Sequence, residues 1–383
     1  MVTSVTPEQL AELQDGDESF VLVDTRDPES YESWHVAGAK NFPYDDGGAI
    51  DDRREELEGL LGDADRILTI CAKGRSSSGF VEELARQGYE DVAVVEGGME
   101  AWSRVYETVP IETGREGLAI VQVQRRAKGC LGYVVADVEE GVAAVIDPSR
   151  HTGEFAAVAD DRGWEIVAVL DTHVHADHLS GGRQLAADRN VPYFLGERAA
   201  ERGVEYPFEA FGRNEVLHVG DVEIKAVPTP GHTTEGVSYL VDDAAILTGD
   251  TLFVHAVGRT ELEFGDDDAA TGAELLYDSL HRTLMCLPDG IRVLPGHAAV
   301  TDEGEYEDGA PGQPIETTIG TLRTGLDVLG LDRENFVERF ETNVPAKPPN
   351  YETVIAINRG QRARPDEAEA TELELGPNRC AAE

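Results

Sequence analysis

A dense group of possible metal ligands lies near the middle of the chain, in the stretch His173-x-His175-x-Asp177-His178. Only 10 histidines occur in 383 residues, and this spacing has odds on the order of one in a thousand by chance. His173 and His175 are two residues apart at the end of a strand-like run, so they point the same way. Asp177 precedes an expected helix, whose positive end favours a carboxylate. The pattern predicts a metal site; the alternative is a set of surface histidines that cap a helix.

Three further residues have the same local setting: His232 in PTPGHTTEG, Asp250 in LTGDTLF and His297 in VLPGHAAV. Each follows a strand-like run and precedes a turn rich in glycine, threonine or alanine. Loops on a rigid sheet can aim ligands from separate strand ends into one pocket. We therefore expect these residues to join the histidine cluster.

A second possible chemical group is Cys71 in the stretch CAKGRSSSG, where an apolar strand runs directly into a helix. The positive end of the helix and two nearby cations favour the thiolate, which is a nucleophile and could carry a persulfide. The alternative is a buried or incidental cysteine. The backbone amides expected to encircle its sulfur belong to Lys73, Gly74, Arg75, Ser76 and Ser77.

The elements that position these residues suggest two α/β domains and a tail. Strands at 19–26, 66–72 and 91–98 with a helix at 77–89 form the β-α-β pattern of a parallel sheet. The pattern lapses in the polar stretch 106–117, where we place a boundary. Strands then dominate, with expected helices near 153–163, 179–189 and 269–287. The predicted units are 1–108, 109–362 and an acidic, flexible tail at 363–383, which has few large apolar residues.

Composition narrows the function classes. A formal charge of −43, with five lysines among 32 basic residues, repels nucleic acid and anionic lipid. This composition resembles that of proteins from cytoplasms with molar salt, where screening shortens the range of charge repulsion to about 3 Å. An acidic mesophilic protein is the alternative.

No apolar run is long enough for a membrane span, and the start lacks a signal-peptide pattern, so we expect a cytoplasmic protein. The cysteines are too far apart for a C-x-x-C site. We expect Cys130 and Cys286 to be core residues and leave Cys380 unassigned.

The ordered motifs H-x-H-x-D-H, G-H, T-G-D and P-G-H resemble the metallo-β-lactamase superfamily over residues 117–360. The resemblance implies an αββα sandwich of two mixed sheets, with a metal at one edge. This scaffold hosts thioesterases, lactamases, flavoprotein reductases and oxygenases, so it does not specify the reaction.

Two segments, GDTLFVHAVGRTELEFGD (249–266) and NVPAKPPNYETVIAINRG (343–360), resemble the persulfide dioxygenase branch; the first also resembles glyoxalase II. The dioxygenase resemblance implies one Fe(II) per chain, held by His173, His232 and Asp250. Its substrates are a low-molecular-weight thiol persulfide and O₂, and its product is sulfite. Two imidazoles and a carboxylate on one face of Fe(II) leave the other face open.

The remaining candidates have roles that depend on the branch. Four of them form one set: His175, Asp177, His178 and His297. In the single-iron arrangement this set orients the iron ligands. In a dizinc hydrolase of the glyoxalase II type, Asp250 bridges the two metals, and Asp177, His178 and His297 hold the second metal. The resemblance also implies substrate binding by Asn358 and by Arg259, whose alternative role is an internal ion pair. Relatives carry Asp-Tyr after the last histidine, whereas this chain has Ala298 and Ala299, which leaves the substrate pose open.

The first hundred residues resemble the rhodanese family through VDTRDPESYESWHVAGAKNFP (23–43), the Cys71 loop and VVEGGMEAW (94–102). The resemblance covers residues 5–105 and implies bracing roles for Asp24 and Arg26 and a turn at His35. Many rhodaneses have arginine where this chain has Ser76, which leaves the sulfur donor open. The sequence thus predicts a rhodanese domain fused to a persulfide dioxygenase. A dizinc thioester hydrolase and a non-oxidative persulfide carrier or sensor are the alternatives, and pairing as a homodimer is left open.

Overall fold

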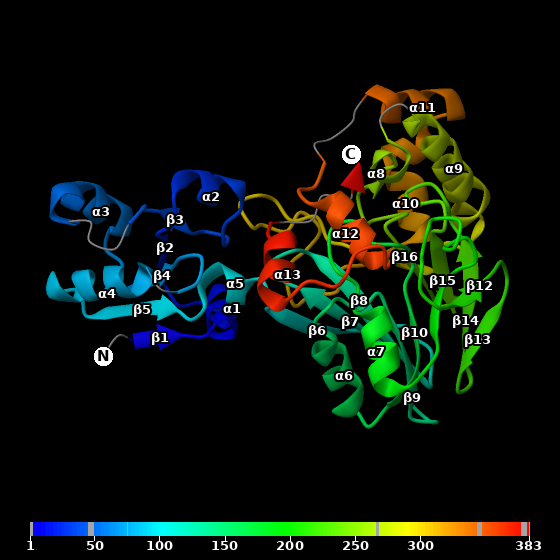
Figure 1. Ribbon diagram of the computed structural model, residues 1–383, viewed down its shortest axis with the longest axis horizontal. Helices are drawn as coiled ribbons and strands as arrows, with labels where there is room; N and C mark the ends of the chain where they lie inside the picture. Colours follow the sequence, from blue (N-terminus) through cyan, green and yellow to red (C-terminus); the bar gives the residue numbers. More distant parts are fainter. Residues whose placement is uncertain are drawn as a thin grey trace.

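The computed structural model describes residues 3–44, 50–74, 76–265, 268–342, 347–376 and 381–382. It contains a smaller N-terminal domain, blue to cyan in Figure 1, beside a larger domain that holds the rest of the chain. Two residues considered above, Arg75 and Cys380, lie outside the described residues, and for Ser76 only the backbone is described.

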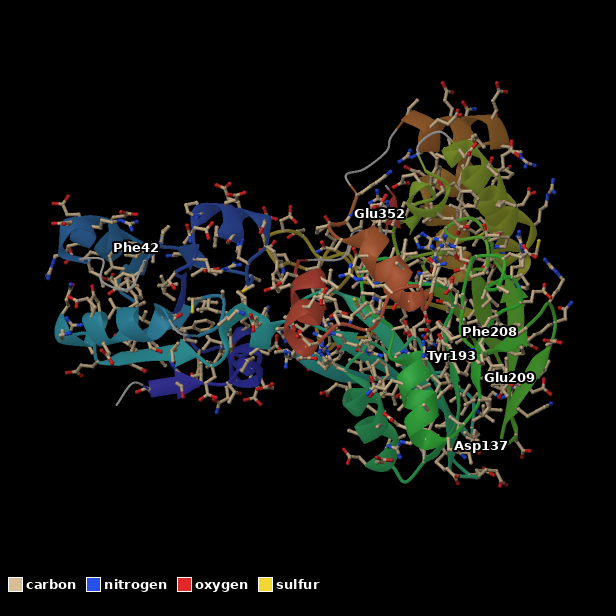
Figure 2. The ribbon with its side chains drawn as sticks, viewed as in Figure 1. Phe42, Asp137, Tyr193, Phe208, Glu209 and Glu352 are labelled. Atoms are coloured by element: carbon tan, nitrogen blue, oxygen red, sulfur yellow. The ribbon has the colours of Figure 1, made fainter. Side chains whose placement is uncertain are left out.

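The N-terminal domain, within the described residues, is a five-stranded sheet in the order β1-β5-β4-β2-β3, and every neighbouring pair is parallel. Helix α4 buries Phe80 and Leu84 against the sheet, and Phe42, labelled in Figure 2, packs on Phe80 with ring centroids 5.5 Å apart. The strands are β1 (Thr3–Val5), β2 (Val21–Asp24), β3 (Lys40–Asn41), β4 (Arg66–Ile70) and β5 (Asp91–Val95). The helices are α1 (Pro7–Asp15), α2 (Pro28–Ser33), α3 (Arg54–Leu61), α4 (Ser76–Arg86) and α5 (Gly98–Trp102), with a 3₁₀ turn at Ile50–Arg53. The predicted parallel sheet is confirmed.

The larger domain is a sandwich of two sheets. The first sheet has the order β12-β11-β10-β9-β8-β7-β6, and the second has the order β13-β14-β15-β16-β18-β19. The strands of the first are β6 (Tyr106–Ile111), β7 (Leu118–Arg125), β8 (Cys130–Asp137), β9 (Val142–Ile146), β10 (Glu165–Leu170), β11 (Tyr193–Gly196) and β12 (Glu209–Phe211). Those of the second are β13 (Val216–Val219), β14 (Val222–Pro228), β15 (Val237–Val241), β16 (Ala245–Gly249), β18 (Arg292–Pro295) and β19 (Thr317–Thr318). A short separate ladder pairs β17 (Val257–Gly258) with β20 (Ala381–Ala382).

The main core lies between the two sheets, where side chains such as Ile120 and Tyr133 meet Ile224 and Tyr239. Helices cover both outer faces: α6 and α7 pack on the first sheet, and α9 packs on the second, with α11 against α9 (Figure 1). The helices are α6 (Thr152–Asp160), α7 (Gly182–Arg189), α8 (Glu261–Phe264), α9 (Ala269–Arg282), α10 (Ile319–Gly325), α11 (Arg333–Thr342), α12 (Tyr351–Asn358) and α13 (Glu367–Leu373), with 3₁₀ turns at Leu284–Cys286 and Asp327–Gly330. This arrangement is the αββα sandwich that the sequence predicts.

The polar stretch after residue 105 is not a simple linker. Tyr106–Ile111 forms β6, which pairs antiparallel with β7 and so adds an edge strand to the sandwich. Its Pro110 is tolerated because an edge strand does not need every backbone donor. Strand β6 runs across the boundary drawn between residues 108 and 109.

The prediction of a flexible tail is wrong for residues 367–374. Helix α13 begins after Asp366, whose side chain accepts a hydrogen bond from the Glu369 amide. It leads to Glu374, which is 1% exposed and forms ion pairs with Arg125 and Arg150, both at 2.8 Å. Composition missed this because the segment is fixed by one buried carboxylate and by the packing of only two apolar side chains, Ala370 and Leu373.

The two domains are in direct contact. Arg126, just after β7, forms an ion pair of 2.6 Å with Asp15 of α1, and the His35 amide donates to the Asp302 carbonyl oxygen. A cavity of about 430 Å³ between the domains is lined by Trp34, Trp102 and other residues of both. None of the described helices is long and apolar enough to cross a membrane.

Candidate metal centre

All seven predicted metal ligands lie on loops that follow strands of the sandwich. His173, His175, Asp177 and His178 follow β10; His232 follows β14; Asp250 follows β16; and His297 follows β18. Each of the seven is at most 6% exposed. The structure separates them into two groups and leaves His175 in a third place.

The first group is His173, His232 and Asp250. Asp250 Oδ2 lies 3.6 Å from His173 Nε2 and 3.7 Å from His232 Nε2. None of these three atoms has a hydrogen-bond partner among the residues that the structure describes, although all are buried. Together they line a space of about 10 Å³. Buried polar atoms are nearly always satisfied, so three orphaned atoms around one small space fit a cation-binding site.

Neighbouring groups fix the rings of the two histidines. His232 Nδ1 donates to the Arg259 carbonyl oxygen at 2.7 Å, and His173 Nδ1 lies 2.9 Å from Thr172 Oγ1. The Thr172 hydroxyl itself donates to Asp147, so its oxygen accepts from His173. Burial lowers the pKa of both histidines, which keeps the rings neutral. Both Nε2 atoms therefore present a lone pair to the shared space, as metal ligands must.

Asp250 connects the two groups. Its Oδ1 accepts from His297 Nδ1 at 2.6 Å, which leaves Oδ2 for the first group. Burial opposes ionisation of Asp250, but the charge of His297 holds its pKa well below the usual range. The carboxylate is thus ionised and oriented without a metal.

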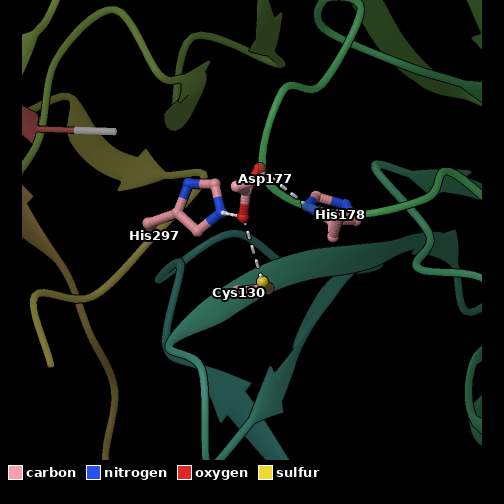
Figure 3. Close-up of side chains that lie close together, drawn as sticks. All are labelled: Cys130, Asp177, His178 and His297. Atoms are coloured by element: carbon pink, nitrogen blue, oxygen red, sulfur yellow. Dashed lines mark hydrogen bonds and ion pairs between the residues drawn. The ribbon is translucent and has the colours of Figure 1, made fainter. Parts of the chain in front are cut away.

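The second group is Asp177, His178, His297 and Cys130 (Figure 3). Asp177 Oδ2 lies 3.0 Å from His297 Nε2 and accepts from Cys130 Sγ at 3.5 Å, while Asp177 Oδ1 lies 3.1 Å from His178 Nδ1. Burial raises the pKa of the Cys130 thiol, but the charges of His178 and His297 outweigh it and lower the pKa to about 6.

Cys130 is buried, as predicted, but its surroundings are not apolar, because its thiol faces this polar cluster. Its neighbours in sequence, Gly129 and Leu131, carry no signal for a site, and Asp177 is 47 residues away. Cys286 is also misassigned, since it is exposed.

His175 belongs to neither group. Its Nε2 lies 3.4 Å from Asp147 Oδ1, in a buried set with Asp171. Asp171 Oδ2 accepts from Tyr193, labelled in Figure 2, at 2.7 Å. The His175 ring nevertheless lies beside that of His173, with centroids 4.3 Å apart, and neither of its ring nitrogens has a hydrogen-bond partner among the described residues.

Asn358, predicted to bind substrate, instead holds the histidine loop. Its Nδ2 donates to the carbonyl oxygens of His175 and His178 at 2.9 and 2.8 Å, and its Oδ1 accepts from the Ser180 amide. The next amide, that of Leu179, donates to Glu374 at 2.8 Å. These two side chains take the amides that would begin a helix at 179, and α7 accordingly begins at Gly182.

Arg259, the predicted substrate anchor, is fully buried and paired with Glu261. This is the internal ion pair that the sequence analysis held as its alternative. The Arg259 carbonyl oxygen orients His232.

The Cys71 loop has the predicted position between β4 and α4. Cys71 is 3% exposed, and its carbonyl oxygen accepts from the Met99 amide at 2.8 Å. A Cβ added to Gly98, which has φ +60°, would lie 2.0 Å from that oxygen, so only glycine fits. Lys73 forms an ion pair with Glu100 at 2.8 Å. Ser77 Oγ is buried and has no hydrogen-bond partner within the described part of the chain.

The bracing residues of this domain also lie as predicted. Arg26 Nη2 pairs with Asp24 Oδ2 at 2.6 Å and donates to the Trp34 carbonyl oxygen at 2.7 Å. His35 stacks on Tyr31 with ring centroids 3.8 Å apart.

Comparison with known proteins agrees with this architecture. The rhodanese-like domain family matches residues 6–105, and the metallo-beta-lactamase superfamily matches residues 125–297. The chain is 34% identical over 249 residues to a hydroxyacylglutathione hydrolase from Polaromonas sp., covering 58% of this chain and 90% of the relative.

Two solved structures resemble the larger domain. One is a metallo-beta-lactamase from Staphylococcus aureus subsp. aureus COL, with 26% identity and a TM-score of 0.57 over 64% of this chain and 73% of that one. The other is ETHE1 from Myxococcus xanthus, with 27% identity and a TM-score of 0.54 over 63% of this chain and 97% of that one.

A buried set of imidazole and carboxylate donors at the edge of an αββα sandwich defines a metal-dependent enzyme scaffold. The chain belongs to the metallo-beta-lactamase superfamily and carries a rhodanese-like domain at its N-terminal side.

Proposed function

We propose that the larger domain is a persulfide dioxygenase that uses one Fe(II) held by His173, His232 and Asp250. The observation that carries the proposal is the contrast between the two groups of donors. The first group leaves three buried atoms without partners, whereas Asp177, His178 and His297 are hydrogen-bonded to one another. Two histidines and one carboxylate with free donor atoms are the ligand set of the non-haem Fe(II) oxygenases.

Fe(II) held by these residues would supply a centre able to bind a persulfide sulfur and O₂. The chain's own residues prepare that site. Thr172 and the Arg259 carbonyl oxygen fix the His173 and His232 rings, and His297 holds Asp250. The overall reaction is RSSH + O₂ + H₂O → RSH + SO₃²⁻ + 2H⁺.

The rhodanese-like domain would handle sulfane sulfur through Cys71. Its thiolate either passes sulfur toward the larger domain or, as a persulfide, transfers it to the sulfite product. The second of these routes is Cys–S–S⁻ + SO₃²⁻ → Cys–S⁻ + S₂O₃²⁻. In it one S–S bond breaks and another forms, so no external oxidant is needed. Joining both domains in one chain raises their effective concentration.

A dizinc thioester hydrolase of the glyoxalase II type is the second candidate. The 34% identity to a hydroxyacylglutathione hydrolase favours it. That chemistry needs Asp250 to bridge two metals, with Asp177, His178 and His297 around the second, to generate hydroxide near neutral pH.

Elemental analysis together with an oxygen-electrode trace tests the proposal. With glutathione persulfide as substrate, we expect one iron per chain, O₂ uptake and sulfite formation. His232→Ala should abolish uptake, while Cys71→Ser should retain it. Two zinc per chain, with thioester hydrolysis and no O₂ uptake, would establish the hydrolase instead. Persulfide transfer without O₂ uptake or hydrolysis would indicate a carrier.

A further inference from the structure

A pocket of about 430 Å³ lies between helix α7, strand β11 and the turn that follows α12. Tyr193, labelled in Figure 2, is part of its wall. Among the described residues, none that lines this pocket also lines the small space around His173, His232 and Asp250. The pocket is therefore separate from the candidate metal centre.

The charge of this pocket is opposite to that of the chain. Its described lining includes Arg183, Arg362 and Arg364 and no acidic residue. The whole chain has 75 acidic residues against 32 lysines and arginines, so a lining that followed the composition would be mainly acidic. A pocket of similar size on the second sheet, about 440 Å³, does have four acidic lining residues. The arginine pocket is thus a local positive region that attracts anions on an acidic protein.

Arg183 is held in position but not neutralised. Its guanidinium lies over the Tyr206 ring, 4.5 Å from the centroid. The Tyr206 hydroxyl donates to the Asn358 carbonyl oxygen at 2.8 Å, which fixes the ring. Gly360, with φ +79°, packs against the same ring, and a Cβ there would lie 2.8 Å from Tyr206 Cδ1. Within the described part of the chain Arg183 has no carboxylate partner, so its donors are available to a ligand.

Arg364 is the second unpaired arginine of the pocket, since it too has no carboxylate partner among the residues that the structure describes. Partial burial lowers the pKa of Arg364, and the positive charges of Arg150 and Arg183 act in the same direction, against the opposing charge of Glu374. Glu374 is already paired with Arg150 at 2.8 Å. An anion in the pocket would relieve the repulsion between these guanidinium groups.

The charge and the space together favour one class of ligand. Guanidinium groups bind phosphate oxygens in pairs of parallel hydrogen bonds. A phosphate monoester carries about −1.5 to −2 charge at pH 7, which matches two unpaired arginines better than a single carboxylate does. The volume falls in the range of small-molecule sites, roughly 300–1,000 Å³, and leaves room for an organic group beside the tyrosine rings.

We propose that this pocket binds a small organic phosphate monoester, whose phosphate is held by Arg183 and Arg364. The organic group lies against the rings of Tyr193 and Tyr206. The proposal does not depend on the reaction at the metal centre.

Calorimetric titration of the full chain with phenyl phosphate tests the site without any assay of turnover. The titration is run at a KCl concentration at which the protein is folded, and we expect one phenyl phosphate per chain. Inorganic phosphate, which lacks the ring, and benzoate, which has a single negative charge, should both bind more weakly. Equal affinity for either comparison compound would overturn the assignment to a phosphate monoester.

Variants at exposed arginines locate the bound phosphate. Arg183→Gln and Arg364→Gln should each weaken binding by about tenfold or more, because each removes a charged hydrogen-bond donor. Arg183→Lys, which keeps the charge but loses the planar fork, should also weaken it.

The matched control is Arg189→Gln, which changes the net charge equally on the same helix. Arg189 lies outside the pocket and pairs with Asp160 at 2.7 Å, so this variant should bind phenyl phosphate as the wild type does. The proposal is overturned if the wild type does not bind phenyl phosphate, if binding survives both Arg183→Gln and Arg364→Gln, or if Arg189→Gln weakens it as much. Failure of O₂ uptake, by contrast, bears only on the proposed function.

Discussion

Glu374 is the buried carboxylate that connects α13 to the histidine loop, and replacing it with glutamine tests that connection. Glu374 Oε2 accepts from Arg125 and Arg150, and Oε1 accepts from the Leu179 amide. Arg150 keeps a second partner, Glu367, at 2.6 Å. Arg125 is 1% exposed at its side chain, and Glu374 is its carboxylate partner in the described structure.

Glu374→Gln therefore leaves the Arg125 charge buried and unpaired. Removing one partner of a buried ion pair costs about 3–5 kcal/mol. Because glutamine retains an acceptor oxygen and Arg150 retains Glu367, we expect a loss of about 3 kcal/mol in the free energy of unfolding. The control is Glu372→Gln, which alters an exposed residue of α13 and should change the free energy of unfolding by less than about 0.5 kcal/mol.

The assay is urea unfolding combined with hydrogen–deuterium exchange of the peptide containing Leu179. In Glu374→Gln the transition of the larger domain should move to lower urea, and exchange should accelerate around Leu179. A stability loss below about 1 kcal/mol, or exchange unchanged from that of Glu372→Gln, would refute the reasoning.

The pH dependence gives a second check on the same variant. Burial raises the pKa of Glu374, but the charges of Arg125 and Arg150 outweigh it and hold the pKa well below its ordinary value of 4.5. A lowered folded-state pKa stabilises the fold above the unfolded value and loses that stabilisation as the pH falls. The stability gap between wild type and variant should thus be constant near neutral pH and narrow below about pH 4.5. A gap that widens in acid would contradict this assignment.

Three further predictions follow from other features. Asn358→Leu removes three hydrogen bonds to the histidine loop and should weaken metal binding on the order of 10–100-fold in chelator competition. Asn335→Leu, at an exposed position, is the control and should leave metal binding unchanged. Equal effects of the two variants would refute the role of Asn358. Gly98→Ala should destabilise the N-terminal domain by about 2–5 kcal/mol in thermal unfolding, because its Cβ would meet the Cys71 carbonyl oxygen, while Gly59→Ala, in open space, should be neutral or stabilising. A net charge of −43 predicts that thermal stability rises from about 0.1 to about 3 M KCl, and a flat or falling curve would contradict this.

The dioxygenase resemblance grouped His173, His232 and Asp250 as one ligand set, and the local sequence placed each of them after a strand-like run. His173, His232 and Asp250 each follow a strand of the sandwich, and strand ends gather at one edge of such a fold. Their position at strand ends was predictable because local sequence determines both the strand and the turn that ends it. Which donor atoms stay free could not be read from the sequence, since that depends on partners such as Thr172 and His297.

The residues that were missed or misassigned depend on contacts across long sequence separations. Cys130 contacts Asp177 across 47 residues, and Glu374 contacts Arg125 across 249 residues. Neither contact leaves a pattern in the local sequence, because the residues around a charge or a thiol do not indicate which distant residue it contacts in the folded chain. Asn358 was found through a resemblance, but its role as a clamp depends on the backbone of the histidine loop.

The link between Leu179 and Glu374 has a consequence for biosynthesis, because 195 residues separate them. At roughly 5–20 residues per second, the ribosome needs about 10–40 s to make that interval. During this time the nascent histidine loop lacks its carboxylate anchor, and Arg125 lacks its counter-ion. The loop can therefore reach its final shape only after residue 374 has been translated, and secure capture of a cation becomes a late event in the maturation of the protein.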